Sequence, residues 1–118
     1  MSNFDFEKFY FTDINHRNYS ACLEAVKLGY GLSLIPEQHL TEELCLESIR
    51  KDIRNFFDIP YEKLNQKICL ELVKLDVSFV RRIPKRFTTD KGIIQAILNS
   101  NDYLKYMKYI PEHMRPFV

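Results

Sequence analysis

The sequence predicts an all-α protein, built as a stack of about four short helical hairpins that resembles an α-solenoid. One repeated segment begins in its first three copies with Cys-Leu-Glu, and its copies start 23, 24 and 24 residues apart: Cys22–Lys27, Cys45–Arg50, Cys69–Lys74 and the degenerate Ile93–Ile97. A second column keeps nearly the same spacing: Ile35-Pro36, Ile59-Pro60, Ile83-Pro84 and Ile110-Pro111. Columns in register over four copies are typical of stacked repeats, in which each unit buries its apolar face against a neighbour.

The first helix of each repeat is predicted to begin just after a capping residue. Four residues before each member of the cysteine column lies a side chain whose oxygen can accept a hydrogen bond from the first helical turn: Asn18, Thr41, Asn65 and Thr89. Glu42, Glu43 and Asp90 then fall in the predicted first turns, where negative charge complements the helix dipole.

The second half of each repeat is predicted to be another short helix. An apolar residue lies four positions before each proline: Leu32, Phe56, Val80 and Met107. Proline cannot continue a helix, so this second helix should end at Ile-Pro. We expect Gly29 and Gly31 to form the turn of the first repeat. Three extra residues in the fourth repeat predict a longer turn around Asn99–Asp102.

These signals predict a single helical-repeat domain over residues 1–118. An N-terminal aromatic cap covers residues 1–17, and the repeats cover about 18–40, 41–64, 65–88 and 89–115. The segment Thr41–Ile49, closed by Ile59-Pro60, resembles a short bacterial or phage helical-repeat family catalogued as a domain of unknown function, with the pattern T-x-E-x-C-L-x-A-V followed by I/V-P-x-x-L. That resemblance implies a helical-repeat fold and carries over no activity and no catalytic residue.

Composition and charge restrict the class of protein. The chain is 46% hydrophobic and 28% charged, which is ordinary for a globular domain, and its net charge of +1 excludes binding to nucleic acid or membrane by bulk charge alone. Its three cysteines form no C-x-x-C pair, no apolar run is long enough to span a membrane, and the N-terminus has no secretory signal. We therefore expect a cytoplasmic protein without a membrane anchor.

No pattern typical of an enzyme, a cofactor site or a metal site occurs in the sequence. His16, His39 and His113 share no helix-face spacing, and no phosphate loop or nucleophile motif is present. The prediction is therefore a protein without catalysis, cofactor or metal, with the cysteine column in the core. The glutamate column remains open between a structural or solvated role and a ladder that faces a basic partner: Glu24, Glu47 and Glu71.

Charge and aromatic patterning indicate where a partner would bind. Residues 1–49 carry a net charge of −5 and residues 50–118 a net charge of +6. A basic cluster surrounds Ile83-Pro84, and we interpret it either as a phosphate-binding surface, with Phe79 and Phe87 available for stacking, or as cations that serve a helix end. Two aromatic clusters either cap the stack or contact a partner. One is the N-terminal group Phe4, Phe6, Phe9, Tyr10 and Phe11, and the other is a tyrosine stripe at three-residue spacing in the last helix, Tyr103, Tyr106 and Tyr109. The candidate partner-binding residues are Phe4, Phe6, Tyr10, Arg81, Arg82, Lys85, Arg86, Tyr103 and Tyr106.

The function expected from these features is macromolecule binding. We expect a small adaptor or inhibitor that binds and occludes a protein partner. The alternative is an RNA- or DNA-binding module that uses the basic C-terminal half, and homodimerisation through an end of the stack is also open.

Overall fold

The structure of the chain, a computed structural model, describes residues 4–116, and every regular element within that range is a helix. The predicted all-α repeat fold is therefore confirmed. The chain divides into two compact units, unit 1 (Met1–Lys63) and unit 2 (Leu64–Val118), so that the division falls next to the predicted boundary between the second and third repeats. The first three residues of the predicted N-terminal cap lie outside the described part.

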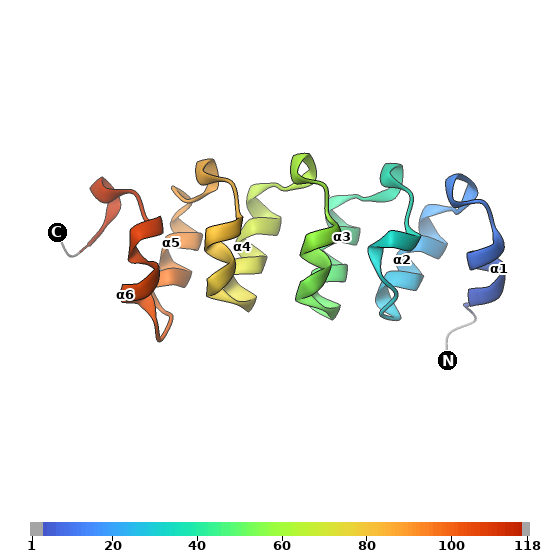
Figure 1. Cartoon of the computed structure of the whole chain (residues 1–118), viewed down its shortest axis with the longest axis horizontal. Coiled ribbons are helices and arrows are strands. Elements are labelled where there is room, and N and C mark those ends of the chain that lie inside the picture. Colours follow the sequence, from blue (N-terminus) through green and yellow to red (C-terminus); the bar gives the residue numbers. More distant parts are fainter. Residues whose placement is uncertain (1–3, 117–118) are drawn as a thin grey trace. The chain divides into compact units, whose positions relative to one another are not determined.

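Unit 1 alternates α-helices with short 3-10 helices, labelled η. Its elements are α1 (Phe6–Phe11), η1 (Ile14–His16), α2 (Tyr19–Lys27), η2 (Leu32–Leu34), η3 (Glu37–His39), α3 (Glu42–Lys51), η4 (Ile53–Asp58) and η5 (Tyr61–Lys63). Helix α2 packs against α3 in one layer, and η2 packs against η4 in the other (Figure 1).

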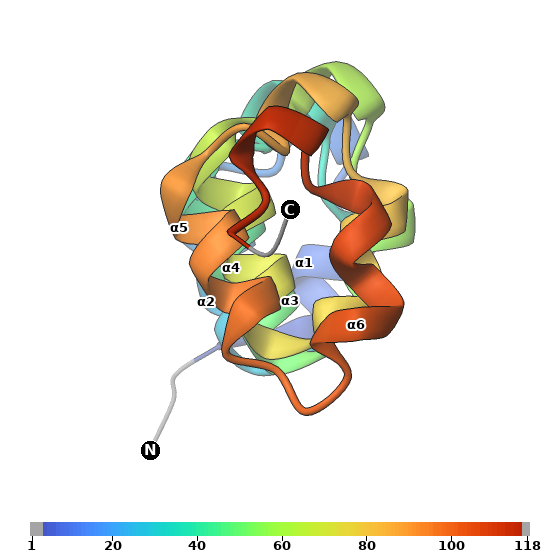
Figure 2. The same ribbon diagram turned by 90° about the vertical axis from the view of Figure 1, so that its left-hand side faces the viewer.

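Unit 2 repeats this plan. Its elements are α4 (Gln66–Leu75), η6 (Val77–Arg82), η7 (Lys85–Phe87), α5 (Lys91–Leu98), α6 (Tyr103–Tyr106), η8 (Met107–Tyr109) and η9 (Glu112–Met114). Helix α4 packs against α5, and η6 packs against α6. Figure 2 shows α4 and α5 on one side of this unit and α6 on the other.

Three of the four predicted N-caps are confirmed. The side-chain oxygens of Asn18, Thr41 and Asn65 accept hydrogen bonds from the backbone N–H groups three residues later, over 2.8, 3.2 and 2.8 Å. The cap predicted at Thr89 is wrong, because Asp90 caps α5 through its Oδ1, 2.9 Å from the N–H of Ile93. One of the three extra residues of the fourth repeat therefore lies before its helix, and the carboxylate of Asp90 takes the capping position rather than a place in the first turn.

The second short helix predicted in each repeat is present, but in the first three repeats it is a 3-10 helix rather than an α-helix. These segments are the 3-10 helices η2, η4 and η6, and only the fourth repeat contains an α-turn there. In the second and third repeats a single aspartate, Asp52 or Asp76, both ends the α-helix and accepts a hydrogen bond from the N–H two residues later. Only six residues then remain before Ile-Pro, and i→i+3 bonding satisfies backbone groups in such short segments.

The turns between the two helices of a repeat differ among the repeats, and the first and fourth repeats are the ones that the sequence singled out. Gly29 is the one described residue with a positive φ, +99°. Its N–H donates to the Val26 carbonyl and the next N–H donates to the Ala25 carbonyl, which is a Schellman ending of α2. Gly31 has an ordinary φ of −74° and begins η2. The longer turn of the fourth repeat is confirmed, because residues 99–102 separate α5 from α6.

The core of each unit is made by the repeated columns. The three cysteines are fully buried, and so are apolar residues one turn further along each helix, such as Val26, Ile49 and Leu72. In unit 1, α1 and η1 have the same layout as the second half of a repeat, and Phe9 points into the core. The aromatic N-terminal segment thus supplies a half-repeat against α2.

Candidate partner-binding site

A basic groove lies in unit 2 between the loop after η6 and the segment from η8 to Arg115. It measures about 420 Å³, and buried side chains of Val80, Ile83 and Ile110 contribute apolar wall. Its charged lining within the described residues comprises four cations and a single carboxylate, that of Glu112. The cations are Arg81, Lys85, Lys108 and Arg115.

Arg115 is held in place by the backbone beneath it. Its Nε donates to the carbonyl oxygen of Ile110 over 2.9 Å, and its Nη2 donates to that of Lys108 over 3.3 Å. Lys108 lies over the ring of Tyr109, 5.5 Å from its centre. Two of the four cations are thus positioned by contacts within unit 2.

The structure brings only part of the predicted basic cluster together. Arg81 and Lys85 line the groove, whereas Arg82 and Arg86 are exposed outside it. Neither aromatic residue offered for base stacking presents an open face. Phe79 is buried, and the guanidinium of Arg86 covers Phe87 at 4.5 Å from the ring centre.

The N-terminal aromatic residues mainly pack against one another. Phe6 stacks on Tyr30 with ring centres 4.5 Å apart, and Phe4 lies 5.9 Å from the same ring. Tyr10, which contacts Phe6, is 50% exposed, and Phe11 beyond it is 80% exposed. Phe4 and Phe6 therefore cover the start of unit 1, and Tyr10 with Phe11 presents surface.

In the tyrosine stripe of the fourth repeat, Tyr106 faces inward. Tyr106 is only 6% exposed, so it belongs to the core of unit 2 and offers a partner little surface. Tyr103 is half-buried. The exposed apolar side chain of α6 is Leu104, at 74%, which the three-residue spacing of the tyrosines had not indicated.

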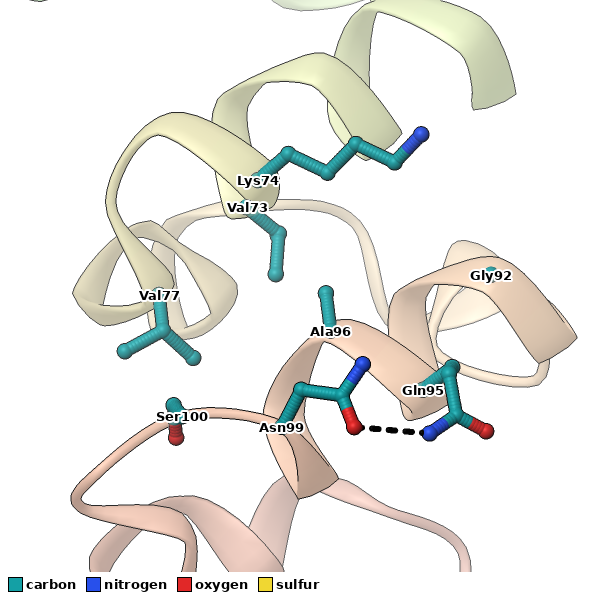
Figure 3. Close-up of a pocket in the computed structure, with 8 residues that line it drawn as sticks. All are labelled: Val73, Lys74, Val77, Gly92, Gln95, Ala96, Asn99 and Ser100. Atoms are coloured by element: carbon teal, nitrogen blue, oxygen red, sulfur yellow. Dashed lines mark hydrogen bonds between the residues drawn. The ribbon is translucent and has the colours of Figure 1, made fainter.

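A second hollow of about 580 Å³ lies between α4 and α5 (Figure 3). Gly92 and Ala96 are among its lining residues, and a Cβ on Gly92 would come within 3.1 Å of Leu70. Gln95 donates to Asn99 over 2.9 Å, and the Ser100 hydroxyl bonds to the backbone of α5. Three of its polar lining residues, Gln95, Asn99 and Ser100, are thus paired within unit 2.

The cysteines lie in the core and are not poised for chemistry. Burial raises the pKa of Cys22, and it raises those of Cys45 and Cys69 to about 11 and about 12. These groups therefore remain neutral thiols near neutral pH. Within residues 4–116, no group of three or more histidine, cysteine or acidic side chains could hold a metal ion.

The glutamate column lies half-buried on the first helices. Glu47 approaches Arg50 three residues later at 4.0 Å, as expected for a helix-surface pair. Glu24 and Glu71 also make interactions. The ladder that would face a basic partner stays a prediction.

Comparisons with models of protein families, with curated proteins and with solved structures each found no match for this chain. The resemblance to the bacterial or phage helical repeat therefore stays a prediction. In the part of the chain that the structure describes, no helix is both long and apolar enough to cross a membrane.

Proposed function

We propose that the chain is a non-catalytic binding protein that holds an acidic segment of a protein partner in the basic groove of unit 2. By covering that segment it acts as a small adaptor or inhibitor. The observation that carries the proposal is the convergence of Arg81, Lys85, Lys108 and Arg115 on one groove with a single carboxylate.

The lining of the groove favours a peptide over a nucleic acid. A single-stranded nucleic acid gains much of its affinity from bases that stack on open aromatic faces. Phe79 is buried and Phe87 is covered by Arg86, and neither lines the groove. The aromatic residue that does line it, Tyr109, has Lys108 over its ring, so this source of affinity is small here. A peptide instead offers carboxylates to the cations and apolar atoms to the wall formed by Ile83 and Ile110.

The expected affinity is moderate. Exposed ion pairs contribute about 0.2–1 kcal/mol each, so four of them alone do not make a tight complex. Apolar contact with the groove wall must add to them, at roughly 25 cal/mol per Å² buried. Binding should therefore weaken with salt without being abolished by it.

The proposal predicts partner capture that depends on the groove. The tagged protein is used to capture partners from a lysate, with and without nuclease, and the bound proteins are identified by mass spectrometry. The wild type should retain one stoichiometric protein after nuclease treatment, and the R81E/K85E variant should lose it because the groove then repels acidic segments. The K27E/K51E variant is the matched control, since it makes the same charge change at exposed lysines of unit 1.

Two outcomes contradict the proposal. If capture collapses with nuclease, the RNA- or DNA-binding alternative takes its place. If R81E/K85E and K27E/K51E capture the same protein equally well, the partner binds elsewhere, and the exposed pair Tyr10 and Phe11 becomes the first surface to test.

A further inference from the structure

Two arginines occupy one position of the repeat and make the same backbone contacts. Arg115 lies four residues after Pro111, at the position that Leu40 and Leu64 hold four residues after Pro36 and Pro60. Arg17 lies four residues after Asp13 in the N-terminal half-repeat. The Nε of each donates to the carbonyl five residues earlier, over 3.1 Å for Arg17 and 2.9 Å for Arg115. The Nη2 of each donates to the carbonyl seven residues earlier.

The two guanidinium groups differ in their third nitrogen. Nη1 of Arg17 donates to the carbonyl oxygen of Leu34 in the following repeat, over 2.6 Å. Arg17 also lies over the ring of Phe9 and is only 8% exposed. Within residues 4–116, no oxygen accepts a hydrogen bond from Nη1 of Arg115, and Arg115 lines the basic groove.

We propose that Arg115 binds a main-chain carbonyl oxygen of an extended acidic peptide, while Arg81, Lys85 and Lys108 bind its carboxylates. The inference rests on the proposed function and names the conformation of its ligand. Arg17 provides the intramolecular example, because the carbonyl of Leu34 that it binds is followed directly by extended backbone at Ile35, with φ −109° and ψ 127°.

The geometry favours Arg115 as the anchor among the four cations. Two backbone hydrogen bonds already fix the plane of its guanidinium, so little side-chain freedom is lost when a ligand binds. A lysine carries the same charge but cannot make two backbone bonds in that plane and donate a third. Arg81 is exposed, and a lysine there keeps the charge that acts on a carboxylate.

The test compares R115K with R82K, two variants that preserve charge, because Arg82 is exposed outside the groove. The probe is a short fluorescein-labelled peptide of alternating glutamate and alanine, with binding followed by fluorescence anisotropy at low salt. We expect R115K to bind it about tenfold or more weakly, the usual effect of losing a hydrogen bond to a charged group, and R82K to remain within about twofold of the wild type.

A second probe separates carbonyl recognition from charge. A short labelled polyacrylate carries carboxylates but no main-chain carbonyls, so R115K should bind it within about twofold of the wild type. Equal losses of affinity for peptide and polyacrylate would show that Arg115 acts only as a charge, and this overturns the inference. Urea unfolding of R115K is measured beside the titration to establish that the variant is folded.

The wild-type protein gives a test that does not depend on folding of a variant. On addition of the peptide, the Nη1 protons of Arg115 should become protected from exchange in NMR spectra, and polyacrylate should leave them exchanging rapidly. Rapid exchange with bound peptide overturns the inference while the proposed function survives. Absence of any binding of the peptide by the wild type defeats the proposed function itself.

Discussion

Tyr19 and Gln66 show how single side chains join neighbouring repeats. Each is the first residue of its helix, directly after the N-cap, and each bonds to the N-cap of the next repeat in its unit. The Tyr19 hydroxyl lies 2.7 Å from Oγ1 of Thr41 and donates to Glu43 over 2.8 Å. Gln66 donates to Asp90 in the same manner. One position of the repeat therefore links helix starts within each unit.

The buried cysteines make stability depend on pH. Because burial raises the pKa of Cys45 to about 11 and that of Cys69 to about 12, the folded protein keeps both thiols protonated where an unfolded chain, with cysteine pKa values of about 8.5, releases their protons. This stabilisation is fully present below about pH 8 and is lost as pH rises toward the folded pKa values.

Urea unfolding at neutral pH and at a pH between the unfolded and folded pKa values measures the effect. We expect the free energy of unfolding to fall at the higher pH. The C45A/C69A variant is the control for other groups that titrate there, and its decrease should be smaller. Equal decreases in both proteins would contradict the role given to the thiols.

At the scale of elements, Asp52 and Asp76 determine how an α-helix passes into a 3-10 helix. Each has extended backbone, with φ −156°, so the chain turns sharply at one residue. Asp76 Oδ1 accepts a hydrogen bond from the N–H of Ser78 over 3.0 Å and another from its hydroxyl over 2.7 Å. No glycine is needed at this turn, unlike that of the first repeat.

The D76A variant tests this capping role. Alanine removes the acceptor at the start of η6, and we expect the free energy of unfolding to fall by about 1 kcal/mol, as for other lost caps. The D76N variant keeps a capping oxygen and should remain close to the wild type. Chemical denaturation measures both. Equal losses in D76A and D76N would mean that charge, rather than capping, stabilises the turn.

The start of a helix was predicted correctly where only one residue before the apolar run could serve as its cap. Asn18, Thr41 and Asn65 are caps because each is the obvious acceptor before an apolar run. At Thr88-Thr89-Asp90 all three residues can cap, and the inserted residue moved the cap to Asp90. The 3-10 conformation was missed because its apolar residues fit an α-turn equally well, and only the short interval after Asp52 and Asp76 distinguishes the two.

The candidate site was predicted only in part. Arg81 and Lys85 are close in sequence and belong to one repeat, so a local cluster of charge revealed them. Lys108 and Arg115 come from the next repeat and reach the groove through the fold. The sequence did contain a signal for Arg115. The residue four positions after the repeat proline is leucine in the first two repeats, Leu40 and Leu64, and an arginine there departs from that pattern.

At the scale of the whole molecule, charge is divided between the two units. Unit 1 contains eleven acidic and seven basic residues, and unit 2 contains five and ten. The net charges are therefore −4 and +5, and the basic groove lies in the unit with the positive charge. An acidic partner is attracted to unit 2 over a distance of about 10 Å at moderate salt, and unit 1 repels it.

The central claim is that an acidic peptide binds in the basic groove of unit 2, and the most direct test is to map the binding surface on the wild-type protein. Backbone amide signals are followed by NMR while the glutamate–alanine peptide is added. The account predicts that the largest changes fall in residues 80–89 and 108–115, with the signals of unit 1 nearly unchanged. Changes confined to residues 6–11 and Tyr30 would instead place the ligand on the aromatic surface and contradict the account.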